Sequence, residues 1–204
     1  LFVDLDRFKW INDSVGHHAG DQLLIAVGHR LEGCVRPSDT VARLGGDEFT
    51  VLVPELRHEH HAFHVAERIL QTLTTPITIE GQEVTACASI GIALGPATYE
   101  EPGQVLRDAD IALHQAKKAG KGRYSVFEPR MHADAVRLMQ LEGDLRRALE
   151  QQQFRLYYQP TISLTSGTIS SFEALLRWEH PQLGRLLPDS FLPIAEETGV
   201  ICRI

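Results

Sequence analysis

Two adjacent glycines, Gly45 and Gly46, separate two short runs of strand-forming residues, 40–42 and 50–53. A tight β-hairpin is predicted here, because the turns that match the twist of paired strands need residues with positive φ. Asp47 and Glu48 follow the glycines, although carboxylates are poor strand formers. The missing side chains let a bulky anion approach the backbone, and the two acids could hold a divalent cation. A solvated hairpin tip, where glycine and aspartate are common, is the alternative on these residues alone.

A second acidic site stands at the start of the chain. Residues 1–5 form an apolar run of strand character that contains Asp4, and Asp6 follows this run directly. Alternation along a strand places Asp6 on the same side as Asp4, so a metal-ligand role and a structural role are both open for Asp6.

Composition excludes several classes of function. The 204 residues suffice for one large domain or one and a part, and the net charge of −7 argues against a nucleic-acid surface. No apolar stretch is long enough to cross a membrane. Three widely spaced cysteines indicate neither a disulfide framework nor a zinc site, so we expect a cytoplasmic protein. The chain starts inside an apolar strand, and we expect further residues before it, through which membrane tethering is open.

Apolar spacing predicts helices and strands in alternation. Helices are expected over three ranges with one apolar face each: 18–35, 59–74 and 103–118. The first of these helices has Asp21 in its first turn. Further strands are expected over 77–79, 84–94 and 123–127. The order predicts an α/β layer with helices on a mixed sheet.

Five segments carry a resemblance to a known family, and they follow its order and spacings from residue 1 to about residue 128: 4–13, 16–21, 45–49, 86–93 and 108–117. In these segments the chain resembles GGDEF-type diguanylate cyclases. The resemblance implies an α+β palm, that is, a nucleotidyl-cyclase-like mixed sheet with a central hairpin flanked by helices. It implies condensation of two GTP molecules into cyclic di-GMP and pyrophosphate by a homodimer.

The resemblance also implies a metal site for Mg²⁺ (or Mn²⁺). Asp4 and Asp47 match the family's metal ligands, and the carbonyl of Leu5 matches a backbone ligand. Glu48 matches a position that binds metal or activates the attacking 3′-hydroxyl, and both roles stay open. Gly45 and Gly46 match the catalytic turn. Such ions neutralise charge that spreads over a transferring phosphoryl group.

Substrate contacts are implied at five further positions. Asn12 and Asp21 match guanine-binding residues, with a turn residue and a helix-terminal charge as the respective alternatives. Lys9 and Lys117 match phosphate-binding lysines. Lys121 stands where the family has arginine, which keeps the charge but loses the bidentate fork.

Arg36 and Asp39 resemble the family's inhibitory product site, an arginine and an aspartate set just before the hairpin. A guanidinium can grip a phosphate or a guanine edge by two parallel hydrogen bonds. The alternative is local: a helix that ends at Arg36, followed by a turn that Asp39 caps.

The remainder of the chain resembles the start of an EAL-type cyclic di-GMP phosphodiesterase. We expect domains over 1–128 and 151–204, joined over 129–150 by a polar linker and a helix. In the last segment, two strands turn at 166–167, and the residues that match EAL positions are Gln159, Glu173, Leu175 and Arg177. A TIM-type barrel needs about 250 residues, so only its truncated beginning is expected, without phosphodiesterase activity.

The sequence therefore leaves two possible functions for the chain. The first is a diguanylate cyclase fused to an incomplete phosphodiesterase domain. The second is a non-catalytic module that binds GTP or cyclic di-GMP and regulates the downstream domain. Degenerate hairpin residues would favour the second, and residues 45–49 are intact.

Overall fold

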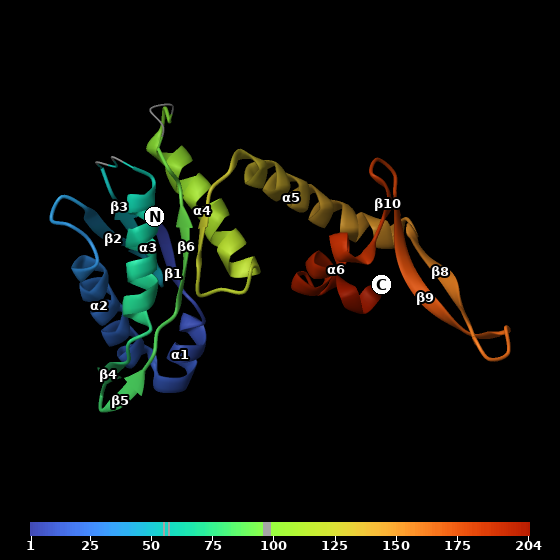
Figure 1. The fold of residues 1–204 in the computed structure, drawn as a ribbon, viewed down its shortest axis with the longest axis horizontal. Coiled ribbons are helices and arrows are strands. Elements are labelled where there is room, and N and C mark those ends of the chain that lie inside the picture. The colour runs from blue at the N-terminus through green and yellow to red at the C-terminus, as the bar shows by residue number, and fades with distance from the viewer. Residues whose placement is uncertain (55, 57, 96–98) are drawn as a thin grey trace. The chain divides into compact units, whose positions relative to one another are not determined.

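The computed structural model describes residues 1–54, 56, 58–95 and 99–204 (Figure 1). The chain divides into two compact units, Leu1–His132 and Ala133–Ile204. Within the described ranges, no helix has the length and apolar character needed to cross a membrane.

The first unit alternates strands and helices in the order β1 (Phe2–Leu5), α1 (Phe8–Val15), α2 (His17–Gly33), β2 (Thr40–Gly45), β3 (Glu48–Leu52), α3 (His60–Leu73), β4 (Ile77–Ile79), β5 (Gln82–Val84), β6 (Ala88–Ile92), α4 (Pro102–Lys118) and β7 (Tyr124–Val126). Strands β2, β3, β1, β6 and β7 form one five-stranded sheet in that order, and β4 pairs with β5. All pairs in the large sheet are antiparallel except β6 with β7. The predicted mixed sheet with helices is confirmed.

The hairpin differs from the prediction in two ways. It lies at one side of the sheet, with β2 as an exposed edge strand, and is not central. Gly45 belongs to β2 and pairs with Glu48, so the two-residue turn is Gly46–Asp47. An irregularity between Arg43 and Gly45 shifts the register, and only Gly46 has positive φ there, at 52°.

Both faces of the sheet are covered near β1. Val3 and Leu5 point into a core that includes residues of α2 and α3, whereas Phe2 packs with Ala109 and Leu113 of α4 on the other face. All four residues of β1 are buried as a result. Asp4, on the α4 side by alternation, is therefore a carboxylate inside the sheet.

Three local predictions are corrected. Residues 8–15 form α1, which begins after Arg7 in a left-handed conformation, where the sequence analysis expected no helix. Helix α2 starts at His17, so that Asp21 lies beyond its first turn. The strand expected over 84–94 is two strands, β5 and β6, which are separated by residues 85–87.

Gly91 allows α4 to lie directly on β6. A Cβ atom at this position would come within 1.9 Å of the Ala109 carbonyl oxygen and 2.3 Å of the Leu113 amide nitrogen. These are backbone atoms of a buried helix, which cannot move aside as a flexible side chain can. The absence of a side chain at Gly91 thus fixes how close the helix comes to the sheet.

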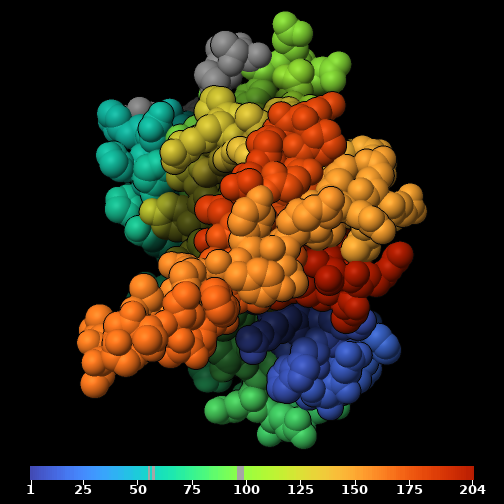
Figure 2. Space-filling model, turned by 90° about the vertical axis from the view of Figure 1, so that its right-hand side faces the viewer, coloured from blue at the N-terminus to red at the C-terminus, as the bar shows by residue number. Residues whose placement is uncertain are grey.

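The second unit contains most of α5 (Pro129–Glu150), then β8 (Phe154–Ile162), β9 (Ile169–His180), β10 (Gly184–Leu186), α6 (Pro188–Glu197) and the 3₁₀ helix η1 (Val200–Arg203). Its three strands pair antiparallel in the order β10-β9-β8. The described residues thus do not confirm the beginning of a parallel barrel. The tip of the β8–β9 hairpin projects from the rest of its unit, in orange in Figure 2, and Leu164 there is fully exposed.

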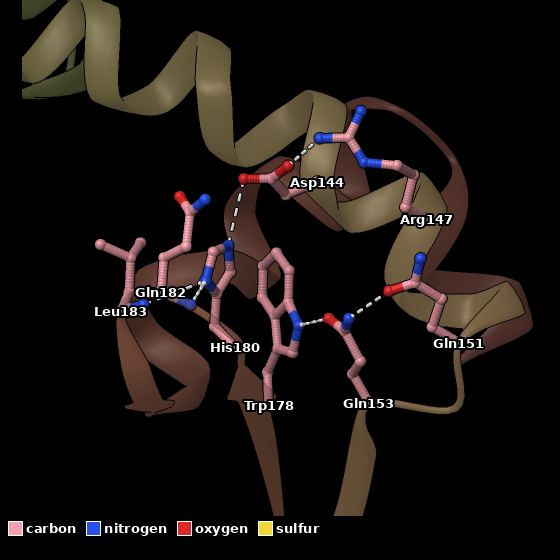
Figure 3. A network of polar contacts seen from close by, with 8 residues as sticks. All are labelled: Asp144, Arg147, Gln151, Gln153, Trp178, His180, Gln182 and Leu183. Carbon is pink, nitrogen blue, oxygen red and sulfur yellow. Dashed lines mark hydrogen bonds and ion pairs between the residues drawn. The ribbon is translucent and has the colours of Figure 1, made fainter.

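A network of hydrogen bonds surrounds Trp178 and His180 in the second unit (Figure 3). The buried indole of Trp178 donates from Nε1 to Gln153 Oε1 over 2.8 Å. His180 Nδ1 accepts from the amides of Gln182 and Leu183, which leaves the Nε2 proton for Asp144 Oδ2 at 3.1 Å. The contact ties α5 to the turn after β9.

We expect Gly91→Ala to lower the free energy of unfolding by about 1–3 kcal/mol, because the added methyl group pushes α4 away from β6. Thermal unfolding followed by circular dichroism measures the change. Gly103→Ala, in the first turn of the same helix, adds a methyl group with no atom within 4 Å and serves as the control. Equal melting temperatures for the two variants would contradict the close approach.

We expect the stabilising effect of the Asp144 carboxylate to depend on pH. The hydrogen bond from His180, with help from Arg147, lowers the pKa of Asp144. A pKa that is lower in the folded protein adds stability above the unfolded value of about 4, and this stability is lost as pH falls through the folded value. Asp144→Asn should therefore lower the denaturation midpoint at pH 7, and the difference from wild type should shrink below about pH 4. A difference that is constant with pH would refute this contribution.

Candidate active site

The acids of the hairpin lie beside Asp4. In the β1–β3 pairing, Asp4 and Glu48 are directly opposite, so their side chains share one face of the sheet. The Leu5 amide donates to the Asp47 carbonyl over 3.3 Å, which joins the turn to the end of β1. The pairing of β1 with β3 thus brings together two acidic segments more than 40 residues apart in the chain.

Asp4 is buried and forms an ion pair with Lys117. The residue is 8% exposed, and Lys117 Nζ from α4 lies 2.7 Å from its Oδ2. Burial raises the pKa of Asp4, against the lowering effect of Lys117, and the nearby charges of Asp47 and Asp6 add to the rise. Burial therefore destabilises the ionised form of Asp4, and a neighbouring positive charge stabilises it.

The residues present fit a magnesium ion that takes part of its coordination from substrate. Among the residues that the structure describes, no cluster of three or more histidine, cysteine or acidic side chains is arranged for a metal. Mg²⁺ needs only one or two carboxylates where phosphates and water complete its shell. The Lys117 ammonium shows that the face of Asp4 and Glu48 accepts positive charge.

Asp6 has structural contacts. Its Oδ1 accepts from the Ser89 hydroxyl over 2.8 Å, and its Oδ2 accepts from the Gly122 amide over 3.0 Å. The carboxylate thus links Ser89 of β6 to Gly122 in the loop after α4. This arrangement favours the structural role of the two that the sequence left open.

The side chain of Asn12 on α1 packs against Gly20 of α2. The Asn12 Oδ1 atom is buried without a hydrogen-bond partner among the described residues. A Cβ atom at Gly20 would lie 1.7 Å from it, so glycine at this position makes room for the amide. Asp21, the next residue, is exposed. Asn12 is helical, so the turn alternative is wrong, and its free acceptor suits a donor of a ligand.

The lysines are only partly brought together. Lys117 reaches Asp4, whereas Lys9 on α1 and Lys121 in the loop after α4 are exposed. A cavity of about 680 Å³, which the sequence did not predict, lies beside Lys121 and is lined by residues of α1, the β5–β6 connection and this loop, including Trp10 and Cys87. Its concave shape depends on tertiary packing, so no sequence signal could have revealed it.

Arg36 and Asp39 lie in one tight turn. The Arg36 amide donates to Asp39 Oδ2 over 2.9 Å, and the Asp39 amide donates to the Arg36 carbonyl over 2.9 Å. These are the turn-capping contacts of the local alternative, although α2 ends at Gly33, earlier than that alternative assumed. The Arg36 side chain is exposed. A role in product inhibition stays a prediction.

The residues that match EAL positions share one hairpin. Gln159 on β8 and Glu173 on β9 are directly opposite, and both are exposed. Leu175 and Arg177 follow Glu173 at alternate positions of β9, and thus lie on the same face. The structure brings these residues to one side of the sheet.

Two parts of the chain match known protein families. Residues 1–123 match the family described as "Diguanylate cyclase, GGDEF domain", and residues 142–204 match the EAL domain family. The isolated GGDEF domain of TpbB (YfiN) from Pseudomonas aeruginosa is a similar solved structure, with a TM-score of 0.63 and 41% identity. That match covers 66% of this chain and 78% of the TpbB domain.

Two relatives from Pseudomonas aeruginosa match the whole chain. MucR, a bifunctional diguanylate cyclase/cyclic di-GMP phosphodiesterase, is 47% identical, and NbdA, a cyclic di-GMP phosphodiesterase, is 42% identical. The chain spans 30% of the length of MucR and 26% of the length of NbdA. The chain therefore belongs to the GGDEF family, whose model it matches over residues 1–123, and its residues 142–204 match the EAL domain model, a pairing that indicates cyclic di-GMP signalling.

Proposed function

We propose that the first unit is a metal-dependent diguanylate cyclase that condenses two GTP molecules into cyclic di-GMP and pyrophosphate. The observation that carries the proposal is the cluster of Asp4, Glu48 and Lys117 beside the intact Gly46–Asp47 turn. Two carboxylates and a lysine on one face suit a nucleotide triphosphate and its metal.

The metal site draws on residues of β1 and the hairpin. Asp4, Asp47 and the Leu5 carbonyl would hold Mg²⁺ or Mn²⁺. Glu48 either joins them or activates the 3′-hydroxyl. When bound, the ions supply neutralisation of charge on the transferring phosphoryl group. Lys117, Lys121 and Lys9 contact phosphate oxygens, and the turn leaves space for the phosphates at Gly45 and Gly46.

Recognition of the guanine base is assigned to Asn12 on α1 and Asp21 on α2. Guanine presents N1–H and N2–H donors on one edge, and the unpartnered Asn12 Oδ1 and the exposed Asp21 carboxylate are acceptors. One unit binds one GTP, so condensation needs a homodimer in which two sites face each other. Released cyclic di-GMP would inhibit through Arg36 and Asp39.

The second unit is proposed to form the first part of an EAL phosphodiesterase barrel of TIM type. In that barrel, Glu173 would serve as a metal ligand, and Gln159 and Arg177 would contact the substrate. The described part exposes these residues on one hairpin and has no parallel strand pair, so it should not hydrolyse cyclic di-GMP alone. The free cysteines and GTP as substrate suit the cytoplasm.

A regulatory, non-catalytic first unit is the second candidate. NbdA shares 42% identity over the same span, and its name gives phosphodiesterase activity alone. Lys121 also lacks the bidentate geometry of arginine. In this case GTP or cyclic di-GMP would bind at the same residues without condensation and would control the EAL domain.

The test uses the complete protein with GTP and, separately, with cyclic di-GMP, and identifies both sets of products. Asp47→Ala combined with Glu48→Ala should reduce cyclic di-GMP synthesis by roughly a thousandfold or more, because the metal and hydroxyl contacts are lost. Asp13→Ala, an exposed acid on α1, should leave synthesis unchanged. GTP binding without product in the wild-type protein would support the regulatory candidate instead.

Gly20→Ala tests whether Asn12 binds the guanine base. The methyl group would displace the Asn12 amide, so we expect KM for GTP to rise by about tenfold while the metal dependence stays the same. Gly28→Ala in the same helix meets only a Phe49 ring carbon at 3.8 Å and is the matched control. An unchanged KM in Gly20→Ala would place guanine elsewhere.

A further inference from the structure

Lys117 contacts the Asp4 carboxylate on which the proposed metal site depends. Its Nζ lies 2.7 Å from Asp4 Oδ2, the distance of a charge-assisted hydrogen bond. The Asp4 side chain is 11% exposed and that of Lys117 is 32% exposed, so solvent screens this pair less than a surface pair.

The sheet and α4 hold the lysine in this place. Gly91 brings α4 against the sheet, and Leu113 of α4 is buried with Phe2. Lys117 follows Leu113 by four residues and lies on the same face of the helix, while Asp4 follows Phe2 by two residues on the same face of β1. The ammonium therefore meets the carboxylate through two rigid elements.

A divalent cation and this ammonium compete for one carboxylate. Asp4 is poorly hydrated, so it binds the positive charge that is present, and two cations on its oxygens would repel each other at short range. A metal ion on Oδ2 would have to displace the ammonium from that oxygen. Lys117 gains a new partner when a triphosphate binds, because phosphate oxygens accept from an ammonium.

We propose that Lys117 blocks Asp4 against a lone divalent cation and releases it only when nucleotide phosphates take over the ammonium. Metal and triphosphate then bind this unit together and not independently. The inference rests on the metal site of the proposed function and adds the order in which that site fills.

The experiment measures Mn²⁺ binding to the 204-residue chain by electron paramagnetic resonance, first without nucleotide. Lys117→Met should bind Mn²⁺ about tenfold or more tightly than wild type. Lys117→Arg keeps the charge and should bind as wild type does. Lys118→Met removes the neighbouring exposed lysine of α4 and controls for net charge. Circular dichroism verifies that each variant is folded.

A non-hydrolysable GTP analogue supplies the second arm. It should raise the Mn²⁺ affinity of wild type and of Lys117→Arg, and should raise that of Lys117→Met by a clearly smaller factor. Equal Mn²⁺ affinities of wild type and Lys117→Met without nucleotide would overturn the inference, as would an equal gain from the analogue in both proteins.

Asp4→Asn separates this failure from failure of the metal site. Combined with Lys117→Met, it should abolish the Mn²⁺ binding that the lysine variant gains. Retained binding would mean that the ion sits elsewhere, which refutes the proposed metal site. If Asp4→Asn removes Mn²⁺ from the nucleotide complex but Lys117→Met gains nothing, the metal site stands and the block by Lys117 is wrong.

Discussion

A carboxylate on a buried face of the central β-strand is the constraint on which the first unit depends. Asp4 lies in β1, which is buried between β3 and β6 and covered on its own side by α4. A buried charge without a partner is costly, so the surroundings must supply a cation or the group must be protonated. The Lys117 ammonium meets this demand in the free chain. In the proposed function, a metal ion that arrives with nucleotide phosphates would meet the same demand.

Two glycines set the positions of two polar side chains of the candidate site, Lys117 and Asn12. Gly91 has no side chain between β6 and α4, so the helix that carries Lys117 packs against backbone. Gly20 leaves room for the buried oxygen of Asn12 between α1 and α2. In both places a small residue in a regular element lowers local propensity and gains a tertiary contact. The fold thus sacrifices some intrinsic stability in order to place polar groups.

The sequence predicted local elements well and tertiary placement poorly. Apolar spacing identified α3 and α4 within about two residues at each end, because one face of each helix is core. It missed α1, a short helix that starts after the left-handed Arg7. The hairpin turn was misplaced by one residue, because an irregularity near Arg43 shifts the register. The pairing of Asp4 with Glu48 is predictable only through a family resemblance, since strand order is not a local property.

The connecting helix shows how the second unit begins. The buried residues of α5 are Leu141, Leu145 and Ala148, and all three belong to the core around Trp178. The turns of α5 before Leu141 contain no buried residue. The sequence there therefore predicts a polar linker, although the segment is helical. Trp178 and His180 bind the later turns of the helix through packing and through Asp144. Helix α5 is therefore stabilised by the packing of its C-terminal half, and extending a helix that already exists costs less than starting a new one.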